Sequence, residues 1–536
     1  MDPRRSLKQY PRKDTIYTHK KSLDFQMRYA KVFLDQPKDK IDSFCEFIVY
    51  VIIGCLVGLT AAIMSNIEEK VTAFRRNQAD NLIDNSETGL LTGWLFFSGI
   101  SVAMVLAASV MTIYWGPGAN GSGVAELMGY LNGINYPKVI SFETLVTKIF
   151  GVLGAVLGGL CVGKEGPLGH IGAIIGATVV YFPVKRFHTY RNDHSKRNMI
   201  AAGCSAGVSA AFGAPIGGTL FAFEISKPNV FWKFSVIWKA CISCSFAVFT
   251  LAVVSSAMKG EGVSDVNSSV LKFGVTNITP PTIDVLPGSI IVGAMTGVLG
   301  AGFVAVNSNL GLLRKKIITK NWQKLAEAAF FSFLTTSTFY WLPYIFQECK
   351  SSVLITGNDK EIIVNYSCPE NNFNPLATMF FNTEGDAIRS LISGFEGPNG
   401  VNASGGYLVL FAAAWYFFTI VTYGVWVPAG LFLPGIIIGC AVGGLYAELQ
   451  AWILGNSIEQ SYSGLNPKNP AVTFVLVGAG AMLSAYTRLT FSLLVIMLET
   501  TSSINIFLPM TFGIFTARIV GNVFTNSLYD RAMRAK

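Results

Sequence analysis

The chain has 536 residues, of which 51% are apolar and only 14% are charged, and its mean hydropathy is +0.46. Soluble domains carry about 25% charged residues, and here apolar segments recur from about residue 46 to about residue 525. These values exclude a soluble multidomain protein and indicate a polytopic helical membrane protein. With only four histidines and no convincing pair of nucleophile and base, the chain is not expected to be an enzyme.

Much of the net charge of +9 lies in a basic tail, residues 1–44. Cytoplasmic loops of membrane proteins carry an excess of Lys and Arg, so we expect the N-terminus to be cytosolic. A protein this apolar is not expected to bind nucleic acid.

The first half of the membrane domain, residues 45–260, mixes long apolar segments with short ones. We expect helices near 44–64, 92–114, 149–162, 168–184, 199–223 and 231–257. The segment near 199–223 is broken at Gly213-Ala-Pro215. Such short or broken segments indicate oblique helices rather than a row of uniform spans.

A connecting segment, residues 261–285, precedes the second half, residues 286–532. This half has the same mixture of long and short apolar segments. A polar region at 347–404 interrupts this half. We expect helices near 290–306, 325–346, 407–425, 431–451, 471–484, 489–498 and 507–524, with Arg488 separating two half-length pieces. Two similar halves predict an all-α inverted repeat.

One apolar run in the first half is too short to cross a bilayer. It covers the 14 uncharged residues from Ile149 to Val162, whereas a spanning helix needs about 20. It ends on Gly163-Lys-Glu-Gly-Pro167. A carboxylate at membrane depth is costly and therefore indicates a functional site. The structural alternative is that Glu165 only caps a helix.

Two other Gly-rich segments, Gly121-Ser-Gly123 and Gly430-Leu-Phe-Leu-Pro434, stand in similar apolar surroundings. The first amides of a helix lack partners and carry a partial positive charge, so such helix starts bind anions. Partial charges also let an anion leave quickly, as a pore requires. These segments predict an anion pathway. Close packing of helices at small residues is the alternative.

Glu165 places a carboxylate where an anion would be bound. It can occupy the anion site when ionised and leave when it is protonated or displaced. We therefore predict that Glu165 is a gate coupled to protons.

Two cysteines, Cys349 and Cys368, flank a polar loop that also carries the sequon Asn365-Tyr-Ser367. A glycan acceptor and a disulfide both fit an extracellular or lumenal face. We predict a disulfide between these cysteines and glycosylation of Asn365. Cys241-x-x-Cys244 lies in an apolar segment without a nearby His, so we expect no metal site.

Taken together and in this order, the motifs resemble the CLC family of chloride channels and chloride/proton antiporters, over about residues 45–532. The matching segments are Gly121-Ser-Gly-Val124, Gly163-Lys-Glu-Gly-Pro167, Phe212-Gly-Ala-Pro215 with Phe221-Ala-Phe-Glu224, Gly430-Leu-Phe-Leu-Pro434 and Ser527-Leu-Tyr-Asp530. Cys368-Pro-Glu-Asn371 and Phe380-Phe-Asn382 are most similar to the eukaryotic endolysosomal branch, which implies an intracellular membrane.

The resemblance implies a role for each matching residue. A central chloride site would take hydroxyls from Ser122 and Tyr529 and amides from Leu431 and Phe432. Amides of Lys164, Gly166 and Leu433 would line an outer site, with Glu165 as the gating glutamate. The resemblance also implies a homodimer with one pore per subunit. It implies chloride as the substrate and no cofactor, and it is compatible with an accessory subunit.

The chain departs from the family pattern at three places. Ala125 replaces a usual Pro, although Ser122 remains and suggests chloride rather than nitrate. Antiporters carry a second Glu that passes protons, but here Glu224 is followed by Ile225, which cannot carry one. Eukaryotic members normally add two cytosolic CBS domains, whereas the sequence given ends at Lys536 without them.

These features predict a chloride channel gated by Glu165. The alternative is a chloride/proton antiporter with an unusual proton route, for which Glu224 could substitute. A second alternative is a non-conducting subunit of a membrane assembly.

Overall fold

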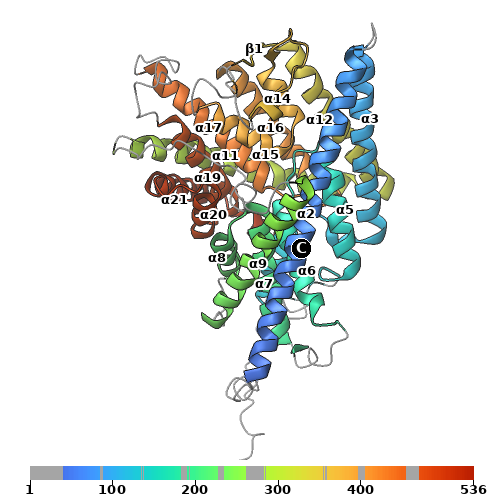
Figure 1. Ribbon diagram of the computed structural model, residues 1–536, viewed down its shortest axis with the longest axis vertical. Coiled ribbons are helices and arrows are strands. Elements are labelled where there is room, and N and C mark those ends of the chain that lie inside the picture. Colours follow the sequence, from blue (N-terminus) through green and yellow to red (C-terminus); the bar gives the residue numbers. More distant parts are fainter. Residues whose placement is uncertain are drawn as a thin grey trace, which may run out of the picture.

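The computed structural model describes residues 40–84, 89–134, 136, 138–182, 190–191, 193–226, 234–260, 283, 285–353, 355, 359–395, 405–453 and 470–535. Helices make up most of this part of the chain (Figure 1). The basic tail up to residue 39 and most of the connecting segment lie outside the described residues.

Long and short helices alternate in the first half, as the apolar segments indicate. Its elements are α2 (Lys40–Asp84), α3 (Gly89–Val110), the π-helical turn η1 (Met111–Trp115), the short η2 (Pro117–Ala119), α4 (Val124–Leu131), α5 (Phe142–Leu157), α6 (Glu165–Val179), α7 (Asp193–Phe212), α8 (Pro215–Ile225) and α9 (Phe234–Lys259).

The second half has the same character. Its elements are α11 (Val285–Ile317), α12 (Asn321–Ile345), β1 (Lys350–Ser351), α13 (Asp359–Ile362), β2 (Asn372–Phe373), α14 (Pro375–Phe381), α15 (Glu384–Ser393), α16 (Gly405–Thr422), α17 (Phe432–Ile453), α19 (Ala471–Thr487), α20 (Phe491–Thr501), α21 (Phe507–Phe524) and α22 (Leu528–Ala535). The strands β1 and β2 pair antiparallel with Lys350 opposite Phe373.

Seven helices in the described part of the chain are long and apolar enough to cross a membrane. The apolar helix expected near 44–64 continues into the polar stretch that follows it, as predicted, and α2 runs as one helix to Asp84. Its polar second part stays helical where buried Glu68 and Arg75 find partners on other elements. Arg488 does separate α19 from α20: it adopts a left-handed φ of 63° at the end of α19.

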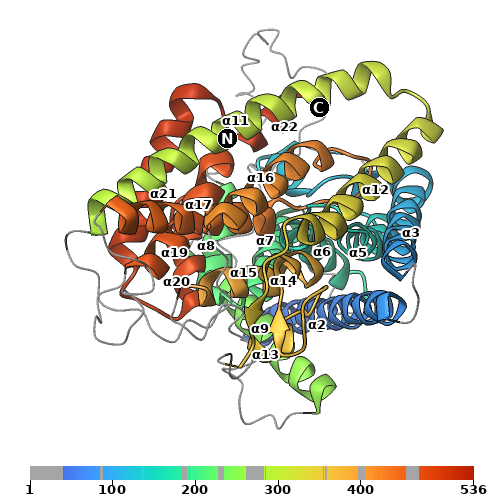
Figure 2. The ribbon, with the colours of Figure 1, turned by 90° about the horizontal axis from the view of Figure 1, so that it is seen from above.

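The two halves pack in the same way, which is the signature of an internal repeat. Helix α6 packs on α7 as α17 packs on α19, and α2 packs on α9 as α11 packs on α21. Helices α2 and α11 lie on opposite sides of the bundle, with α6, α7 and α17 between them (Figure 2).

Glycine pairs allow the inner helices of both halves to touch. A Cβ on Gly172 of α6 would lie 2.1 Å from the carbonyl oxygen of Gly203 on α7. In the second half, a Cβ on Gly439 would lie 2.3 Å from the carbonyl oxygen of Gly478. Backbones approach this closely only where side chains are absent, as in other small-residue helix interfaces.

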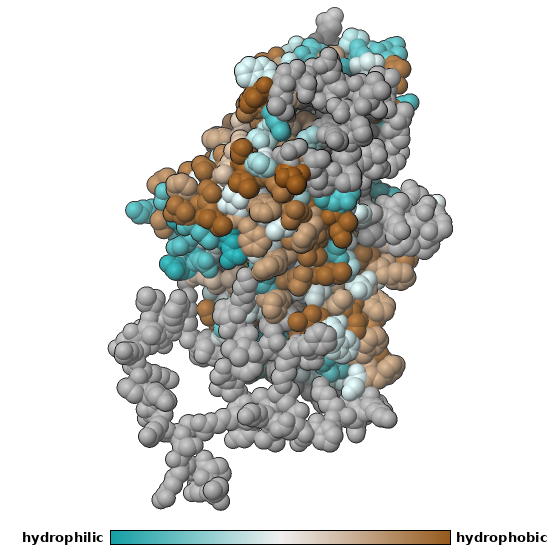
Figure 3. All heavy atoms as spheres, turned by 90° about the vertical axis from the view of Figure 1, so that its left-hand side faces the viewer, coloured by the Kyte–Doolittle hydropathy of each residue, from teal (hydrophilic) through white to brown (hydrophobic). Residues whose placement is uncertain are grey.

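The best-buried span is α17, whose apolar window is 78% buried, while the other candidate spans reach 50% at most. Almost every residue of α6 is buried as well. The helices that begin at the two Gly-x-x-x-Pro motifs therefore form the centre of the molecule. Apolar residues form a broad band across the middle of one outer face, which fits a lipid-facing surface (Figure 3).

Candidate anion pathway

The starts of α6 and α17 face each other at the centre of the fold. The amide of Gly163 donates to the carbonyl of Gly430 at 2.8 Å, and the amide of Gly430 donates back to Gly163 at 2.9 Å. Each helix begins two residues after its glycine, with Glu165 in one half and Phe432 in the other. The bridge satisfies both glycine backbones and places the starts of the two helices, whose first amides lack intrahelical partners, next to each other.

A third backbone segment, Gly121-Ser-Gly123, is held against the same bridge. The amide of Gly121 donates to Val427 at 3.1 Å, and the amide of Ala429 donates to Gly121 at 3.2 Å. A Cβ placed on Gly166 would lie 3.4 Å from the Ser122 Cβ and 3.6 Å from the Gly430 Cα. The structure therefore brings together the three Gly-rich segments that the sequence singles out.

Ser122 is buried beside α4, where its hydroxyl accepts a 3.3 Å hydrogen bond from the amide of Val124. Its hydroxyl also lies near the side chain of Tyr423, a residue that the sequence did not suggest. The aromatic ring of Phe432 borders the same space, since a Cβ on Gly166 would lie 3.6 Å from it. A small, polar, buried hydroxyl is thus available next to the start of α17.

Tyr529 is buried on α22, which packs against α4 and α19. It lies within electrostatic range of Tyr423 and Tyr486. The Tyr486 hydroxyl donates to the carbonyl of Leu431 at 2.6 Å and so is committed to the backbone. Tyr529 therefore lies in the same region as Tyr423 and as Tyr486, which holds the segment that leads into α17.

The Glu165 side chain turns back toward the meeting point of the two helix starts. Only 1% of Glu165 is exposed, and its Oε2 would lie 2.7 Å from a Cβ built on Gly163. The same Cβ would lie 3.3 Å from the amide nitrogen of Leu433. The carboxylate thus lies beside amides at the start of α17, where an anion would be attracted.

Lys164 points away from this region. Its ammonium group forms a buried ion pair with Glu68 of α2 and donates to the Ser65 hydroxyl at 3.0 Å. Its charge is therefore neutralised on the α2 side, and its contribution to an anion site is limited to its backbone. This fits the argument that a fast pathway relies on partial charges.

A second buried lysine, Lys148 of α5, supports the Gly121-Ser-Gly123 segment. Its ammonium donates to the carbonyls of Ala119 and Gly121 at 2.8 and 2.7 Å. His170 lies behind the same segment, with Nε2 3.0 Å from the carbonyl of Val139. Sequence reasoning missed Lys148 because nothing in its neighbourhood along the chain marks it.

Comparison with known proteins identifies the family. A family model described as voltage gated chloride channel matches residues 102–522, which include all three Gly-rich segments. The chain belongs to this CLC family.

Curated CLC relatives match nearly the whole chain. The human H(+)/Cl(-) exchange transporter 7 is 32% identical over 99% of this chain and 66% of its own length. The bovine protein of the same name is 32% identical over 95% and 63%. Chloride channel protein CLC-d of Arabidopsis thaliana is 30% identical over 90% and 62%. The chain thus spans about two thirds of the length of these relatives.

Solved CLC structures share the fold. A eukaryotic CLC transporter superposes with a TM-score of 0.64 at 22% identity, covering 91% of this chain and 74% of that one. A slow cyanobacterial Cl-/H+ antiporter gives a TM-score of 0.70 at 17% identity, covering 91% and 97%. The expected fold, a CLC-type repeat of oblique and broken helices, is confirmed.

Glu224, which precedes the departure at Ile225, caps a helix of the other half. Its carboxylate accepts hydrogen bonds from the amides of Thr490 and Ser492 at 3.0 and 3.1 Å, and from their hydroxyls at 3.1 and 2.6 Å. These groups form the start of α20. Ile225 is 1% exposed, with an apolar side chain in the core.

The capping is reciprocal. Glu499, near the end of α20, accepts from the amides of Ile216 and Gly217 at 3.0 and 2.7 Å, and these amides belong to the start of α8. The helices α8 and α20 therefore cap each other through one glutamate apiece. The sequence gives no sign of this pairing, because the partners are 266 to 283 residues apart.

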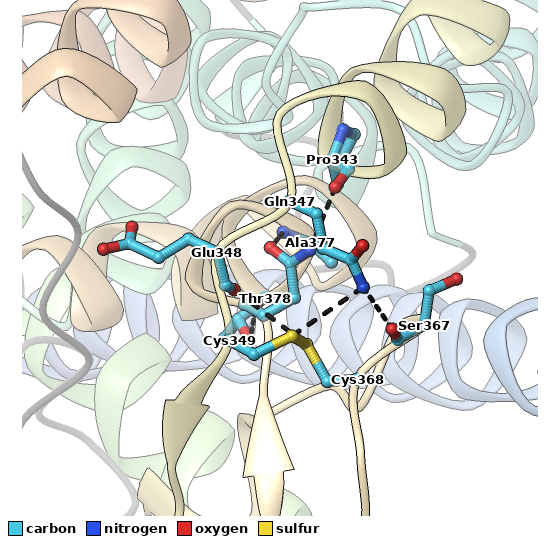
Figure 4. Close-up of a disulfide and its surroundings, with 9 residues drawn as sticks. Pro343, Gln347, Glu348, Cys349, Ser367, Cys368, Ala377 and Thr378 are labelled. Carbon is cyan, nitrogen blue, oxygen red and sulfur yellow. Dashed lines mark hydrogen bonds between the residues drawn. A yellow bond between two sulfur atoms is a disulfide. The ribbon is translucent and has the colours of Figure 1, made fainter.

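Cys349 and Cys368 form a disulfide with an S–S distance of 1.98 Å (Figure 4). It lies beside the β1–β2 pair, and Gln347 bonds the carbonyl of Ser367 next to it. Asn365 is exposed in the same loop.

Proposed function

We propose that the chain conducts chloride along the contact of α4, α6 and α17, and that Glu165 gates this path. The carboxylate beside the starts of two helices is the observation that carries the proposal. When ionised, it competes with chloride for the same amides. When protonated or displaced, it leaves the amides to the anion.

Two chloride sites follow from this arrangement. The hydroxyls of Ser122 and Tyr529 and the amides of Leu431 and Phe432 form the central one. The outer site uses amides of Lys164, Gly166 and Leu433. Neither site needs a cationic side chain, so bound chloride is released quickly.

Passive conduction is the first candidate because an apolar residue stands here at the position where antiporters carry the proton-transferring glutamate. Ile225 is buried and carries no proton, and Glu224 is held by four hydrogen bonds at the start of α20. A carboxylate so fully engaged is a poor proton carrier.

Chloride/proton exchange is the second candidate. It is favoured by the 32% identity to proteins named H(+)/Cl(-) exchange transporter 7. In that case protons reach Glu165 by a route that bypasses position 225.

The zero-current potential of reconstituted protein separates the two candidates. Purified protein in liposomes is placed under a chloride gradient, and a pH gradient is then imposed. A potential that follows chloride alone supports a channel, and a potential that shifts with the pH gradient supports an exchanger. Absence of chloride flux in verified, folded protein would overturn both and favour a non-conducting subunit.

We further propose a homodimer in an endolysosomal or other intracellular membrane, with the N-terminus cytosolic and with room for an accessory subunit. The helices α8 and α20 present apolar side chains outward, with Ile216 56% and Phe491 58% exposed. Such a face suits either a partner subunit or lipid.

A further inference from the structure

A small polar cavity lies next to the gate, outside the anion pathway. Its volume is about 40 Å³. A single water needs about 10–15 Å³ of such space, so the cavity has room for about three or four waters. Its polar lining consists of Glu68, Thr72, Arg75, Thr336, Asn382, Thr383, Glu384 and Trp415.

Glu384, the first residue of α15, is 7% exposed. Among the residues that the structure describes, its Oε2 has no hydrogen-bond partner, and neither has the indole nitrogen of Trp415, which also lines the cavity. Buried polar atoms are normally satisfied by protein or by ordered water. Two such atoms on one cavity indicate that it contains water.

The cavity and the gate share a wall. Glu68 lines the cavity and forms the ion pair with Lys164, which directly precedes Glu165. Gly159 and Leu160, which also line the cavity, lead into the same motif. A charge on a group that lines the cavity therefore changes the electrostatic potential at Glu165.

Several charged or titratable groups face Glu384. The start of α6 contributes Glu165 and Lys164, and α2 contributes Glu68 and Arg75. Cys161 lies within electrostatic range of Glu384, and Arg76 of α2 donates to Asn382, which lines the same cavity. Glu384 lies outside the candidate spans. Burial raises the pKa of its carboxyl well above the ordinary value, Glu165 and Glu68 raise it further, and Lys164 lowers it.

We propose that Glu384 is a second proton-binding site, reached through the water of this cavity, whose charge sets the pH at which Glu165 opens the anion pathway. The proposal rests on the gating role of Glu165. When Glu384 loses its proton, its negative charge opposes the ionisation of Glu165, because like charges disfavour each other's charged forms. The coupling is reciprocal, so the two carboxyls titrate as a pair.

The test is the pH midpoint of chloride flux in liposomes. Glu384→Gln removes the negative charge, so Glu165 ionises more readily and the midpoint moves to lower pH, by on the order of one unit. Glu384→Asp keeps a titratable group and should shift the midpoint less. Glu370→Gln removes an exposed carboxylate from the neighbouring loop and should leave the midpoint unchanged.

An unchanged midpoint in folded Glu384→Gln protein would overturn the proposal. If this variant does not fold, pH-difference infrared spectroscopy of Glu384→Asp against the wild type reports whether a carboxyl band changes with the side chain at this position. No such change would also overturn it.

The double variant Glu165→Gln/Glu384→Gln separates this proposal from the gating role itself. If Glu165→Gln alone abolishes the pH dependence while Glu384→Gln leaves the midpoint unchanged, the gate stands and the second site fails. If Glu165→Gln keeps the full pH dependence while Glu384→Gln and the double variant both lose it, Glu384 binds the proton and Glu165 is not the gate.

Discussion

Glu165 carries the gating proposal through its position, because its carboxylate lies beside the start of a helix from the other half of the chain. A cap of its own helix would be directed at the amides of α6. The Oε2 atom instead lies near Gly163, on the side where the start of α17 also approaches this glycine. The geometry therefore favours the functional reading over the simple helix cap.

Replacing Glu165 by Gln tests the gate directly. A neutral side chain competes weakly for the amides of α17, so flux should be as high at neutral pH as it is for the wild type in acid. The pH dependence should disappear. Liposome flux measured over a pH series checks this, and retention of the wild-type pH profile would exclude the gating role.

The central site depends on hydroxyl groups from two distant parts of the chain. Removing one hydrogen bond to a charged ligand costs about 1.5–3 kcal/mol. Ser122→Ala combined with Tyr529→Phe should therefore weaken chloride binding by tenfold or more, as measured by calorimetry.

Tyr416→Phe is a matched control for Tyr529→Phe, because its hydroxyl bonds the carbonyl of Leu299 in another part of the molecule. It should leave chloride affinity unchanged. Equal affinity in the double variant and the wild type would remove Ser122 and Tyr529 from the site.

At the scale of elements, the two halves are joined by pairs of equivalent features. The Gly163–Gly430 bridge joins the two helix starts, and Glu224 and Glu499 cap α20 and α8. These contacts link residues that are far apart in sequence, so they orient the halves relative to each other. The proposed anion pathway lies where this orientation brings the helix starts together.

The reciprocal caps give Glu224 a structural role. Glu224→Gln should lower the thermal stability of the purified protein, by about 1.5–3 kcal/mol, because four donors lose a charged acceptor. Glu499→Gln should have a smaller effect, since two amides depend on it. Thermal unfolding in detergent measures both.

A different result would assign Glu224 to proton transfer. If Glu224→Gln were as stable as the wild type but lost a proton-driven shift of the zero-current potential, the carboxylate would be a proton carrier. The exchanger reading would then be preferred.

At the scale of the whole molecule, the loop between α12 and α14 is joined by one covalent link. Cys349 and Cys368 are 19 residues apart, and closing a loop of this length stabilises a protein by about 3 kcal/mol. Cys349→Ser/Cys368→Ser should therefore melt at a lower temperature than the wild type. Cys241→Ser, which removes a free cysteine, should not. Equal melting of all three would argue against a stabilising bridge.

The assembly is expected to be a dimer. Mass photometry in detergent should then show twice the chain mass of 58.0 kDa, after correction for bound detergent. Ile216 and Phe491 on the faces of α8 and α20 are the side chains whose replacement by a large polar residue should shift the protein to monomers. A monomeric wild-type protein would contradict the dimer and indicate that this face contacts lipid.

Local features of the sequence predict the class of the protein and the main elements of the proposed pathway. Hydropathy is a local property, so the helices near 92–114, 231–257 and 507–524 could be predicted within a few residues. Gly, Pro and a charged residue interrupt apolar runs through their own backbone and solvation chemistry, so the helix starts at Glu165 and Phe432 and the break at Arg488 could be predicted as well.

Only the tertiary structure decided which of these starts meet and what surrounds them. Tyr423, Lys148 and the Glu224–Glu499 caps contribute through contacts with segments far away in the chain, and no local pattern encodes such contacts. The same holds for Glu384, because nothing in the sequence around it distinguishes it from an ordinary polar residue that follows a loop. Its importance arises because folding removes it from water and places it in a cavity beside the gate, and burial is a property of the packed molecule rather than of the chain.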